Sequence, residues 1–336
     1  MNIIIPMAGM GKRMRPHTLS VPKPLIPVGG KPIVQRLVED ITKVCGEKVE
    51  EIGFVIGRNF GLEVEKKLIE IAKSEGAEGR IYYQDEALGT AHAVLCAEKS
   101  INGKTVVAFA DTLFKADFTM DTSKEGVIWV QKIEDPRQFG VVKLNEEGVI
   151  TDFIEKPEVF VSDLAIIGIY YFRDGENLKE EVKYLINHDI REKGEYQLTN
   201  ALENMKAKGK KFFPGRVTEW LDCGNKNATV YTNQRVLEFD KGKQHLKEKG
   251  VVIENSIVIE PCFLGENTKI LNSIVGPHVS IGKGGLVENS VIKNSILQNQ
   301  TIVVSANIVN SMLGNHAEVH GAALDLSVGD YNVYKA

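Results

Sequence analysis

The first part of the chain alternates short apolar runs with longer segments whose apolar residues recur every three or four positions. The apolar runs predict buried strands and the periodic segments predict amphipathic helices. Strands are expected at residues 2–6, 51–56, 80–84 and 105–110, and helices at 33–44, 62–72 and 89–99. Such alternation is typical of βαβ units, in which helices cover both faces of a sheet. It predicts a Rossmann-like α/β fold with a mixed, mainly parallel sheet.

Beyond residue 110, the regular alternation of predicted strands and helices ends. Two further apolar runs predict strands at residues 126–133 and 164–172, and a hairpin is expected at 139–154. Helices at 178–190 and 197–208 and a segment at 218–222 complete the domain. A polar helix at 227–239 and a lysine-rich stretch at 241–249 then predict a connector.

From residue 251 the chain consists of short apolar pairs separated by Gly, Asn, Ser and Glu, at spacings near six. The dipeptide Asn-Ser recurs at positions 255, 272, 289 and 294. A six-residue period predicts a parallel β-helix of hexapeptide repeats, in which each coil stacks on the last. We therefore expect an α/β domain at 1–226, a helical connector at 227–250 and a β-helix at 251–336.

The first predicted strand leads into Gly9 and Gly11 and a cluster of cations that includes Arg13. A glycine turn lets backbone N–H groups approach a phosphate, and the cations neutralise its charge. Lys23 follows between two prolines, which hold the backbone extended and so fix the position of the lysine. The turn has neither the third glycine of a Rossmann fingerprint nor the Ser/Thr of a Walker A loop. It predicts an anion-binding loop of neither common type.

Other polar residues follow predicted strands, and ligands of parallel sheets bind at the carboxyl ends of strands. Asp111 and Asp222 each end a strand, and two carboxylates suit one hard cation such as Mg²⁺. Glu155 can accept hydrogen bonds from vicinal hydroxyls, Lys156 can bind a phosphate, and the Gln84 amide can read a base edge. Each residue alone is more often a cap or turn residue, so only the combination with the anion loop indicates chemistry.

Composition narrows the class of function. The net charge of -4 provides no basic field for nucleic acid, and no apolar stretch reaches the length of a membrane span. Four cysteines without CxxC spacing argue against zinc and against a disulfide framework. These features predict a cytoplasmic protein with no nucleic-acid or membrane partner. His17, His92 and His188 are dispersed, so we expect them at surface or core positions.

Residues 9–32 resemble the signature of the sugar-1-phosphate nucleotidyltransferases, Gly-x-Gly-x-Arg followed by Pro-Lys-Pro-Leu-x-Pro-Val-x-Gly-Lys-Pro. Further segments in that family's order are 88–93, 139–141, 153–157, 167–168, 195–200 and 220–224. Two positions depart from the family, since Asn200 replaces the usual Asp and Thr112 replaces the Asn or Asp that often follows Asp111. The resemblance extends over the whole chain because many members carry a C-terminal left-handed β-helix.

The resemblance implies that the phosphate of a sugar-1-phosphate attacks the α-phosphorus of a nucleoside triphosphate and that pyrophosphate leaves. UTP or dTTP with glucose-1-phosphate or a related hexose-1-phosphate are the expected substrates, and Mg²⁺ is the expected cofactor. The implied catalytic residues are Arg13 and Lys23, and the implied metal ligands are Asp111 and Asp222. The implied nucleotide-binding residues are Ala8, Gly9, Gly11, Gln84, Gly89 and Thr90. The implied sugar-phosphate-binding residues are Gly140, Glu155, Lys156 and Gly168.

Two alternatives stay open. The β-helix could add an acyltransferase activity, for which His278, His316 or His320 could serve as the general base. A non-catalytic regulatory relative would have lost the cations or the metal ligands, whereas this chain keeps Arg13 and both aspartates. Assembly into a homo-oligomer through the β-helix is expected, because stacked repeats leave faces and edges to cover.

Overall fold

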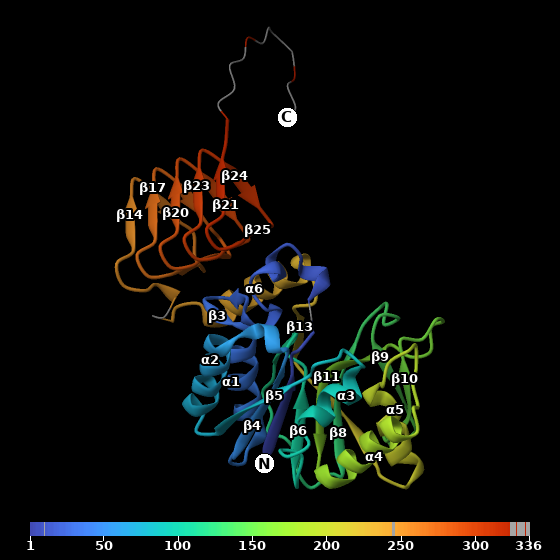
Figure 1. Cartoon of the computed structure of the whole chain (residues 1–336). Helices are drawn as coiled ribbons and strands as arrows, with labels where there is room; N and C mark the ends of the chain where they lie inside the picture. Colours follow the sequence, from blue (N-terminus) through green and yellow to red (C-terminus); the bar gives the residue numbers. More distant parts are fainter. Residues whose placement is uncertain (10, 244–245, 323–326, 328–332, 334–336) are drawn as a thin grey trace. The chain divides into compact units, whose positions relative to one another are not determined.

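The computed structural model describes residues 1–9, 11–243, 246–322, 327 and 333 (Figure 1). The chain forms two compact units, of which the first comprises Met1–Ile26 and Lys31–Asn225 and the second comprises Pro27–Gly30 and Lys226–Ala336. The helix that the sequence predicts as a connector thus belongs to the second unit. In the described part of the chain, no helix has the length and apolar character needed to span a membrane.

A nine-stranded sheet forms the centre of the first unit, in the order β10-β9-β11-β6-β1-β4-β5, with β8 beside β11 and β12 beside β8. The strands are β1 (Asn2–Pro6), β4 (Glu51–Ile56), β5 (Glu78–Tyr83), β6 (Thr105–Ala108), β8 (Gly126–Lys132), β9 (Gly140–Leu144), β10 (Ile150–Glu155), β11 (Leu164–Phe172) and β12 (Phe212–Arg216). β1 is parallel to β4 and β6, whereas β11 is antiparallel to β6, β8 and β9. The mixed sheet of the predicted α/β fold is confirmed.

The strand order reverses at β1. The chain leaves β1 for β4 and β5 on one side and returns to β6 on the other side. The carboxyl ends of β1, β4, β5 and β6 share one edge of the sheet because these strands are parallel. A reversal of this kind opens a crevice at that edge, where ligands of α/β folds bind.

Five helices pack on this sheet in two groups, shown in Figure 1. They are α1 (Ile33–Cys45), α2 (Leu62–Ser74), α3 (Thr90–Cys96), α4 (Gly175–Asn187) and α5 (Leu198–Ala207). All five predicted helices are present, although α3 ends three residues before the predicted end. α1 and α2 pack together, with α2 against β4 and β5, while α3, α4 and α5 form the second group.

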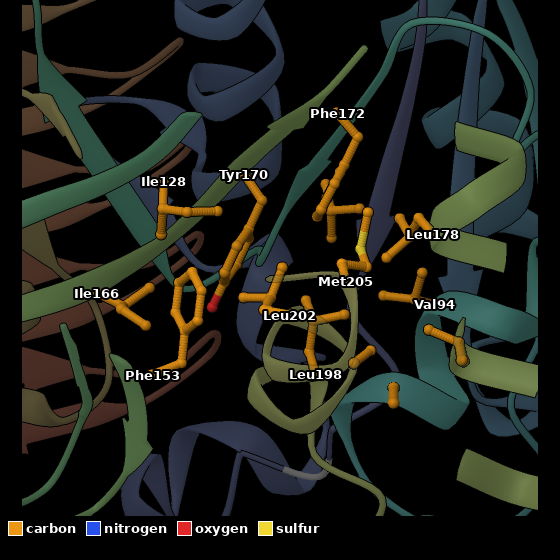
Figure 2. Packing of buried hydrophobic residues seen from close by; sticks show 14 of the residues in the cluster. Val94, Ile128, Phe153, Ile166, Tyr170, Phe172, Leu178, Leu198, Leu202 and Met205 are labelled. Atoms are coloured by element: carbon orange, nitrogen blue, oxygen red, sulfur yellow. The ribbon is translucent and has the colours of Figure 1, made fainter. Parts of the chain in front are cut away.

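The second group of helices covers a continuous apolar core (Figure 2). Ile4, Val55 and Val107 contribute to it from three adjacent strands, and Leu198 and Leu202 contribute from α5. Because successive strand residues point to opposite faces, the buried neighbours of Ile4 on β1 point to the other face of the sheet. This core holds β1 and β6 rigidly beside the crevice.

Two strands of the first unit do not follow from the sequence pattern. β7 (Thr112–Lys115) begins soon after β6 and pairs with β13 (Glu219–Asp222) in a separate two-stranded sheet. β12 contains Pro214 and Gly215, which both lower the strand propensity of a segment. β12 tolerates the proline because it is an edge strand that pairs only with β8.

The loop after β1 has its own short elements. They are the 3-10 helices η1 (Lys12–Met14), η2 (His17–Leu19) and η3 (Lys23–Leu25) and the two-residue strands β2 (Pro27–Val28) and β3 (Lys31–Pro32), while η4 (Arg58–Phe60) follows β4. Lys23 and Pro24 thus lie in the 3-10 helix η3, which corrects the expectation of extended backbone there, whereas Pro22 keeps extended angles of φ -55° and ψ 136°.

The second unit consists of α6 (Lys226–Asp240) and three stacked parallel sheets. The first sheet comprises β14 (Val252–Glu254), β17 (Lys269–Leu271), β20 (Leu286–Glu288), β23 (Ile302–Val304) and β26 (Glu318–His320). The second comprises β15 (Ile257–Val258), β18 (Ile274–Val275), β21 (Val291–Lys293) and β24 (Asn307–Val309), and the third comprises β16 (Phe263–Leu264), β19 (Val279–Ile281), β22 (Ser295–Leu297) and β25 (Met312–Leu313). The predicted parallel β-helix is confirmed, and its left-handed winding stays a prediction.

The repeat is shorter than a strict hexapeptide period would give. Val252 pairs with Lys269, which is 17 residues later, and Ile302 pairs with Glu318, which is 16 residues later. A coil of three hexapeptides would need 18 residues, so the spacing near six is only an average along the chain. Ile270, Val287 and Val303 form one fully buried inward column.

The recurrent Asn-Ser pairs form corners of the β-helix. Asn272 and Asn289 adopt left-handed backbone angles, which asparagine tolerates better than most residues. The Ser273 hydroxyl donates to the Leu271 carbonyl at 2.7 Å and accepts the backbone N–H of Ser290, in the next coil, at 3.0 Å. Corner serines such as Ser273 therefore stabilise both their own turn and the adjacent coil.

We predict that Ser273→Ala destabilises the β-helix locally, because it leaves the buried Ser290 N–H without an acceptor. The expected cost is about 1–3 kcal/mol, and hydrogen exchange of the Ser290 amide should accelerate at least about fivefold. Ser311→Ala is the matched control, since the Ser311 hydroxyl donates to the Val309 carbonyl but accepts no hydrogen bond from the described residues. Equal effects of the two variants would contradict this role of the corner serines.

Candidate active site

Two adjoining cavities open at the carboxyl edge of the sheet, and both are lined by Thr90, Phe109 and Asp111. The first has a volume of about 240 Å³ and the second about 180 Å³. Of the predicted site residues, the first cavity holds Ala8, Gly9, Gly11, Lys23, Gln84, Gly89, Thr90 and Asp111. The second holds Arg13, Thr90, Asp111, Gly140, Glu155, Lys156, Gly168 and Asp222. The structure thus brings together every residue that the sequence predicts for the site.

The loop after β1 presents unpaired backbone donors to the first cavity. The N–H groups of Ala8, Gly9 and Gly11 donate to no group in the described ranges. Gly11 has a left-handed φ of 56°, and a Cβ there would lie 3.1 Å from the Lys23 Cβ. The glycine therefore lets the loop pack closely against Lys23, and the free N–H groups suit an anion.

Lys23 and Asp111 form an ion pair across the crevice. The Lys23 Nζ lies 2.7 Å from Asp111 Oδ2, and the two side chains are 14% and 35% exposed. Burial alone would raise the pKa of the Asp111 carboxyl, but the Lys23 ammonium and Arg13 outweigh burial and hold this pKa below its usual value. Asp111 is therefore an anion at neutral pH, held where the two cavities meet.

Asp222 lies beside this pair. β13 pairs with β7 so that Asp222 faces Thr112, and the Cys223 N–H donates to the Asp111 carbonyl at 2.9 Å. Burial and the negative charge of Asp111 raise the pKa of the Asp222 carboxyl, although Lys23 and Arg13 act in the opposite direction.

Two neighbouring carboxylates, one of which has a raised pKa, are a suitable donor set for a hard divalent cation. Asp111 and Asp222 could supply two oxygens, whereas no group of three or more His, Cys, Asp or Glu that could hold a metal occurs among the described residues. A cation here would have to complete its coordination with phosphate oxygens and water, as Mg²⁺ prefers. The two carboxylates are thus compatible with the expected metal only when a phosphate ligand is also bound.

Glu155 and Lys156 lie at the end of β10, on the wall of the second cavity. Thr199 donates to Glu155 Oε2 at 3.3 Å, and the Lys156 Nζ lies 3.3 Å from Glu155 Oε1. Lys156 has a left-handed φ of 43°, and Lys193 Nζ donates to its carbonyl at 2.6 Å. Sequence analysis did not identify Lys193, whose only signal is its position just before the 195–200 segment.

Thr112 also lines the second cavity, at the position where the chain departs from the family pattern. Its hydroxyl donates to the Ile167 carbonyl at 2.6 Å, and the residue is 3% exposed. Because that hydrogen is already used, the Thr112 hydroxyl can only accept from a ligand.

The segment around Gly89 is bound to the segment that begins at Glu195. Tyr196 accepts the Ala91 N–H at 2.9 Å and donates its own N–H to the Leu88 carbonyl at 2.8 Å. Gly89 has a φ of 120°, and a Cβ there would lie 2.5 Å from the Tyr196 carbonyl oxygen. Only glycine therefore allows this approach, which places the start of α3 at the first cavity.

His92 contacts a predicted site residue. His92 lines neither cavity, as its expected surface or core position allows, but its Nδ1 lies 3.2 Å from the Nε2 of Gln84, which lines the first cavity. A lone histidine on a predicted helix gives no sign of this contact, since it depends on how α3 meets the end of β5.

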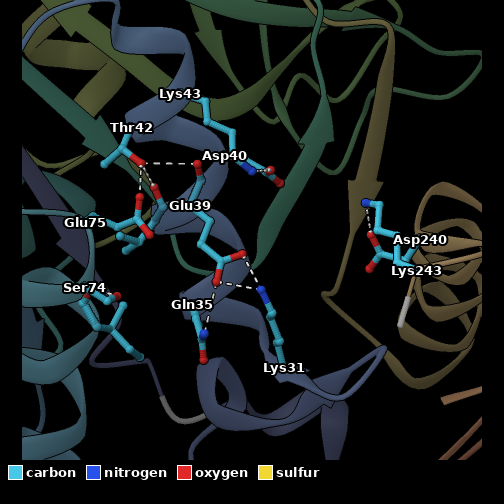
Figure 3. A network of polar contacts seen from close by, with 12 residues as sticks. Lys31, Gln35, Glu39, Asp40, Thr42, Lys43, Ser74, Glu75, Asp240 and Lys243 are labelled. Carbon is cyan, nitrogen blue, oxygen red and sulfur yellow. Dashed lines mark hydrogen bonds and ion pairs between the residues drawn. The ribbon is translucent and has the colours of Figure 1, made fainter. Parts of the chain in front are cut away.

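The two lysines of the 9–32 signature differ in their surroundings. Lys23 lines the first cavity, whereas Lys31 Nζ bonds Glu39 Oε2 at 2.8 Å on α1, as Figure 3 shows. Gln35 also donates to Glu39, and Thr42, one helical turn farther on, donates to Glu75 (Figure 3). The signature therefore combines a lysine at the site with a lysine that stabilises the start of α1.

Comparisons with known proteins find relatives along most of the chain. A family model described as "Nucleotidyl transferase" matches residues 2–238. The chain is 29% identical to the low-salt glycan biosynthesis nucleotidyltransferase Agl11 of Haloferax volcanii, over 94% of this chain and 92% of that protein. It is 27% identical to a glucose-1-phosphate thymidylyltransferase of Streptomyces griseus, over 99% of this chain and 98% of that protein.

A third relative is the bifunctional protein GlmU of Methanococcus maripaludis, which is 31% identical over 77% of this chain and 60% of its own length. Among solved structures, a UDP-glucose pyrophosphorylase complexed with UDP-glucose matches with a TM-score of 0.58. It is 23% identical and covers 71% of this chain and 98% of that chain. At this identity the structural match shows the fold.

We predict that Thr112→Val destabilises the first unit by about 1–2 kcal/mol, because the Ile167 carbonyl loses its buried donor. Urea unfolding monitored by tryptophan fluorescence measures the change, and Thr151→Val on β10 is the control. Thr151 donates only to the neighbouring Asp152 side chain, so a change within about 0.5 kcal/mol is expected there. A Thr112→Val midpoint equal to that of the control would show that this hydrogen bond contributes little.

Proposed function

The chain belongs to the nucleotidyl transferase family, and on this basis we propose that it transfers a nucleoside monophosphate from a nucleoside triphosphate to a sugar-1-phosphate. The products are an NDP-sugar and pyrophosphate. The observation that carries the proposal is the pair of adjoining cavities that meet at Asp111. One has free backbone donors and the other has Glu155 and Lys156, so two substrates can bind with their phosphates adjacent.

In the proposed reaction, a phosphate oxygen of the sugar-1-phosphate forms a bond to the α-phosphorus of the triphosphate. The bond from that phosphorus to the bridging oxygen breaks, and its electron pair leaves with pyrophosphate. The attacking oxygen is already an anion, so no side chain has to remove a proton. The protein must therefore supply alignment and charge neutralisation, which dominate phosphoryl-group transfer.

Each cationic side chain of the two cavities is assigned a role in the proposed reaction. Lys23, held by Asp111, lies where the two phosphates would meet, and Arg13 acts on both aspartates from the second cavity. Lys156 would bind the sugar phosphate and Glu155 the sugar hydroxyls, while the N–H groups of the loop after β1 would bind the triphosphate. Asp111 and Asp222 would hold Mg²⁺, which supplies further positive charge to the phosphates when bound.

Glucose-1-phosphate or a related hexose-1-phosphate with UTP or dTTP are the proposed substrates. The support is the name of the Streptomyces griseus relative, which acts on glucose-1-phosphate and a thymidine nucleotide. The residues of the second cavity fit a hydroxylated ring, since polar Glu155 and Thr199 lie near apolar Phe139 and Trp220.

An additional acyl transfer in the β-helix is the second candidate function, favoured by relatives named as bifunctional. Within the second unit, His278 Nε2 lies 2.6 Å from Glu238 Oε1, and His320 Nε2 lies 3.2 Å from Glu318 Oε2. A histidine held by a carboxylate can act as a general base. Consumption of acetyl-CoA in the presence of an amino-sugar phosphate would support this candidate, and its absence would leave the nucleotidyl transfer alone.

Homo-oligomeric assembly is also part of the proposal. Ile257, Ile274 and Val291 stack in register on the outer face of one β-helix sheet and are 60%, 40% and 44% exposed. A continuous apolar column of this kind supports self-association, and sedimentation velocity would detect it.

The cellular location is proposed from the cysteines. The four cysteines are unbridged, which supports a reducing compartment such as the cytoplasm.

The function is tested by coupled detection of pyrophosphate over a panel of five nucleoside triphosphates and several sugar-1-phosphates with Mg²⁺. We expect release with UTP or dTTP and a hexose-1-phosphate, and none when the sugar phosphate is omitted. Absence of release across the whole panel would contradict the proposed function.

We predict that Lys23→Ala lowers kcat at least about 100-fold, because the reacting phosphates lose a positioned charge. Lys31→Ala is the matched control, since it removes an ion pair of similar length outside both cavities, and it should change kcat less than about threefold. Lys23→Arg keeps an ion pair with Asp111 and tests whether loss of folding explains the result. A folded Lys23→Ala enzyme with near-normal turnover would contradict the assignment.

A further inference from the structure

The side chain of Gln84 is held by two contacts at the edge of the first cavity. Its Nε2 lies 3.2 Å from the Gly89 carbonyl oxygen and 3.2 Å from His92 Nδ1. A carbonyl oxygen can only accept a hydrogen bond, so the Gln84 atom beside it must be the amide nitrogen. The contact with Gly89 thus fixes which end of the amide points to α3.

The contact with Gln84 determines the protonation state and the tautomer of His92. The amide nitrogen of Gln84 has two hydrogens and no lone pair to offer, so His92 Nδ1 must be the acceptor. The ring is therefore neutral, with its proton on Nε2. Both hydrogens of the Gln84 amide are then used within the protein.

The remaining groups at this edge are available to a ligand. Gln84 lines the first cavity, and its Oε1 accepts no hydrogen bond from any residue that the structure describes. The Gly89 N–H also has no acceptor among those residues. The edge therefore offers one acceptor, Gln84 Oε1, and one donor, the Gly89 N–H.

We propose that His92 is a positioning residue for base recognition, which holds the Gln84 amide so that its Oε1 faces the N3–H of a uracil or thymine ring. The inference rests on the proposed function, because it requires a nucleoside triphosphate in the first cavity. It goes beyond that function by assigning to His92, which does not line the cavity, the orientation of the amide that meets the base.

The chemistry of the bases carries the assignment. Uracil and thymine have an N3–H donor flanked by two carbonyl oxygens, so Gln84 Oε1 can accept from N3 and the Gly89 N–H can donate to a carbonyl. Cytosine has an unprotonated N3 at the same place, which would face the lone pairs of Oε1. A polar site rejects a base that leaves its groups unpaired. Uracil and thymine differ only in a methyl group on C5, which is neither a donor nor an acceptor, so the two groups at this edge do not distinguish them.

The arrangement is expected to depend on pH. Burial lowers the pKa of the His92 ring, against the opposing effect of the Glu86 carboxylate and carbonyl. No charged group of β1, β4, α4 or α5, the elements packed against α3, affects the ring among the described residues. As pH falls through the lowered pKa, the ring gains a proton on Nδ1 and loses its acceptor, so binding of UTP or dTTP should weaken on the acidic side.

The test measures nucleotide binding by isothermal titration calorimetry with the full chain and Mg²⁺, without sugar-1-phosphate. UTP, dTTP and CTP are titrated at several values from about pH 7.5 down to about pH 4.5, because the lowered pKa of His92 moves its protonation below the ordinary histidine range. His92→Asn keeps an acceptor near the Nδ1 position but cannot be protonated, and His92→Phe keeps a ring without an acceptor. Both variants share every other titrating group, including the nucleotide phosphates.

We expect His92→Phe to raise the Kd for UTP and dTTP about 3- to 10-fold while changing the Kd for CTP much less. His92→Asn should bind UTP and dTTP nearly as the unmodified chain does at the higher pH, and should lose less affinity at the lower pH. Equal weakening for all three nucleotides would indicate a merely structural role and overturn the proposal. Unchanged base preference and identical pH dependence in both variants would also overturn it.

The result separates the two proposals. If no nucleoside triphosphate binds the unmodified chain, the proposed function fails and His92 has no base to position. If UTP or dTTP binds and the variants behave like the unmodified chain, only the role of His92 fails.

Discussion

The ion pair between Lys23 and Asp111 is the interaction on which the rest of the site depends. It connects the loop after β1 to the end of β6, on either side of the position where the strand order reverses. Asp111 lines both cavities together with Thr90 and Phe109, and it is the charged residue among these three. A partly buried carboxylate needs a partner to remain charged, and Lys23 provides that partner at 2.7 Å.

Two carboxylates and two cations lie together around this pair. Burial and the negative charge of Asp111 raise the pKa of Asp222, and Lys23 and Arg13 offset that rise only in part. Substrates that carry several phosphates would add more negative charge at the same place. The cations and free N–H groups at this place can neutralise that charge. Because the reaction requires no base, this neutralisation is the main chemical contribution of the protein.

The sequence predicted the parts of the site that depend on local rules. Glycine turns, strand ends and the resemblance to a family signature placed every predicted residue around the two cavities. The missed features depend on contacts between distant segments: His92 meets Gln84 only through the packing of α3, and Lys193 meets Lys156 across the second cavity edge. β12 was missed because proline and glycine lower local strand propensity, whereas pairing with β8 outweighs that preference. The shorter coil of the β-helix was hidden by apolar pairs whose spacing varies.

The corners of the β-helix have a consequence for how this unit can change over evolutionary time. Each coil of 16 or 17 residues pairs its strands with the coils directly before and after it, and its corner serine bonds its own turn and the next coil. An insertion or deletion of one whole coil would therefore preserve the strand pairs of the remaining coils, although the coil of His278 and Ser280 also bonds α6. The number of coils in such a unit can therefore change one coil at a time. Selection can act on this number without altering the sequence of the other coils.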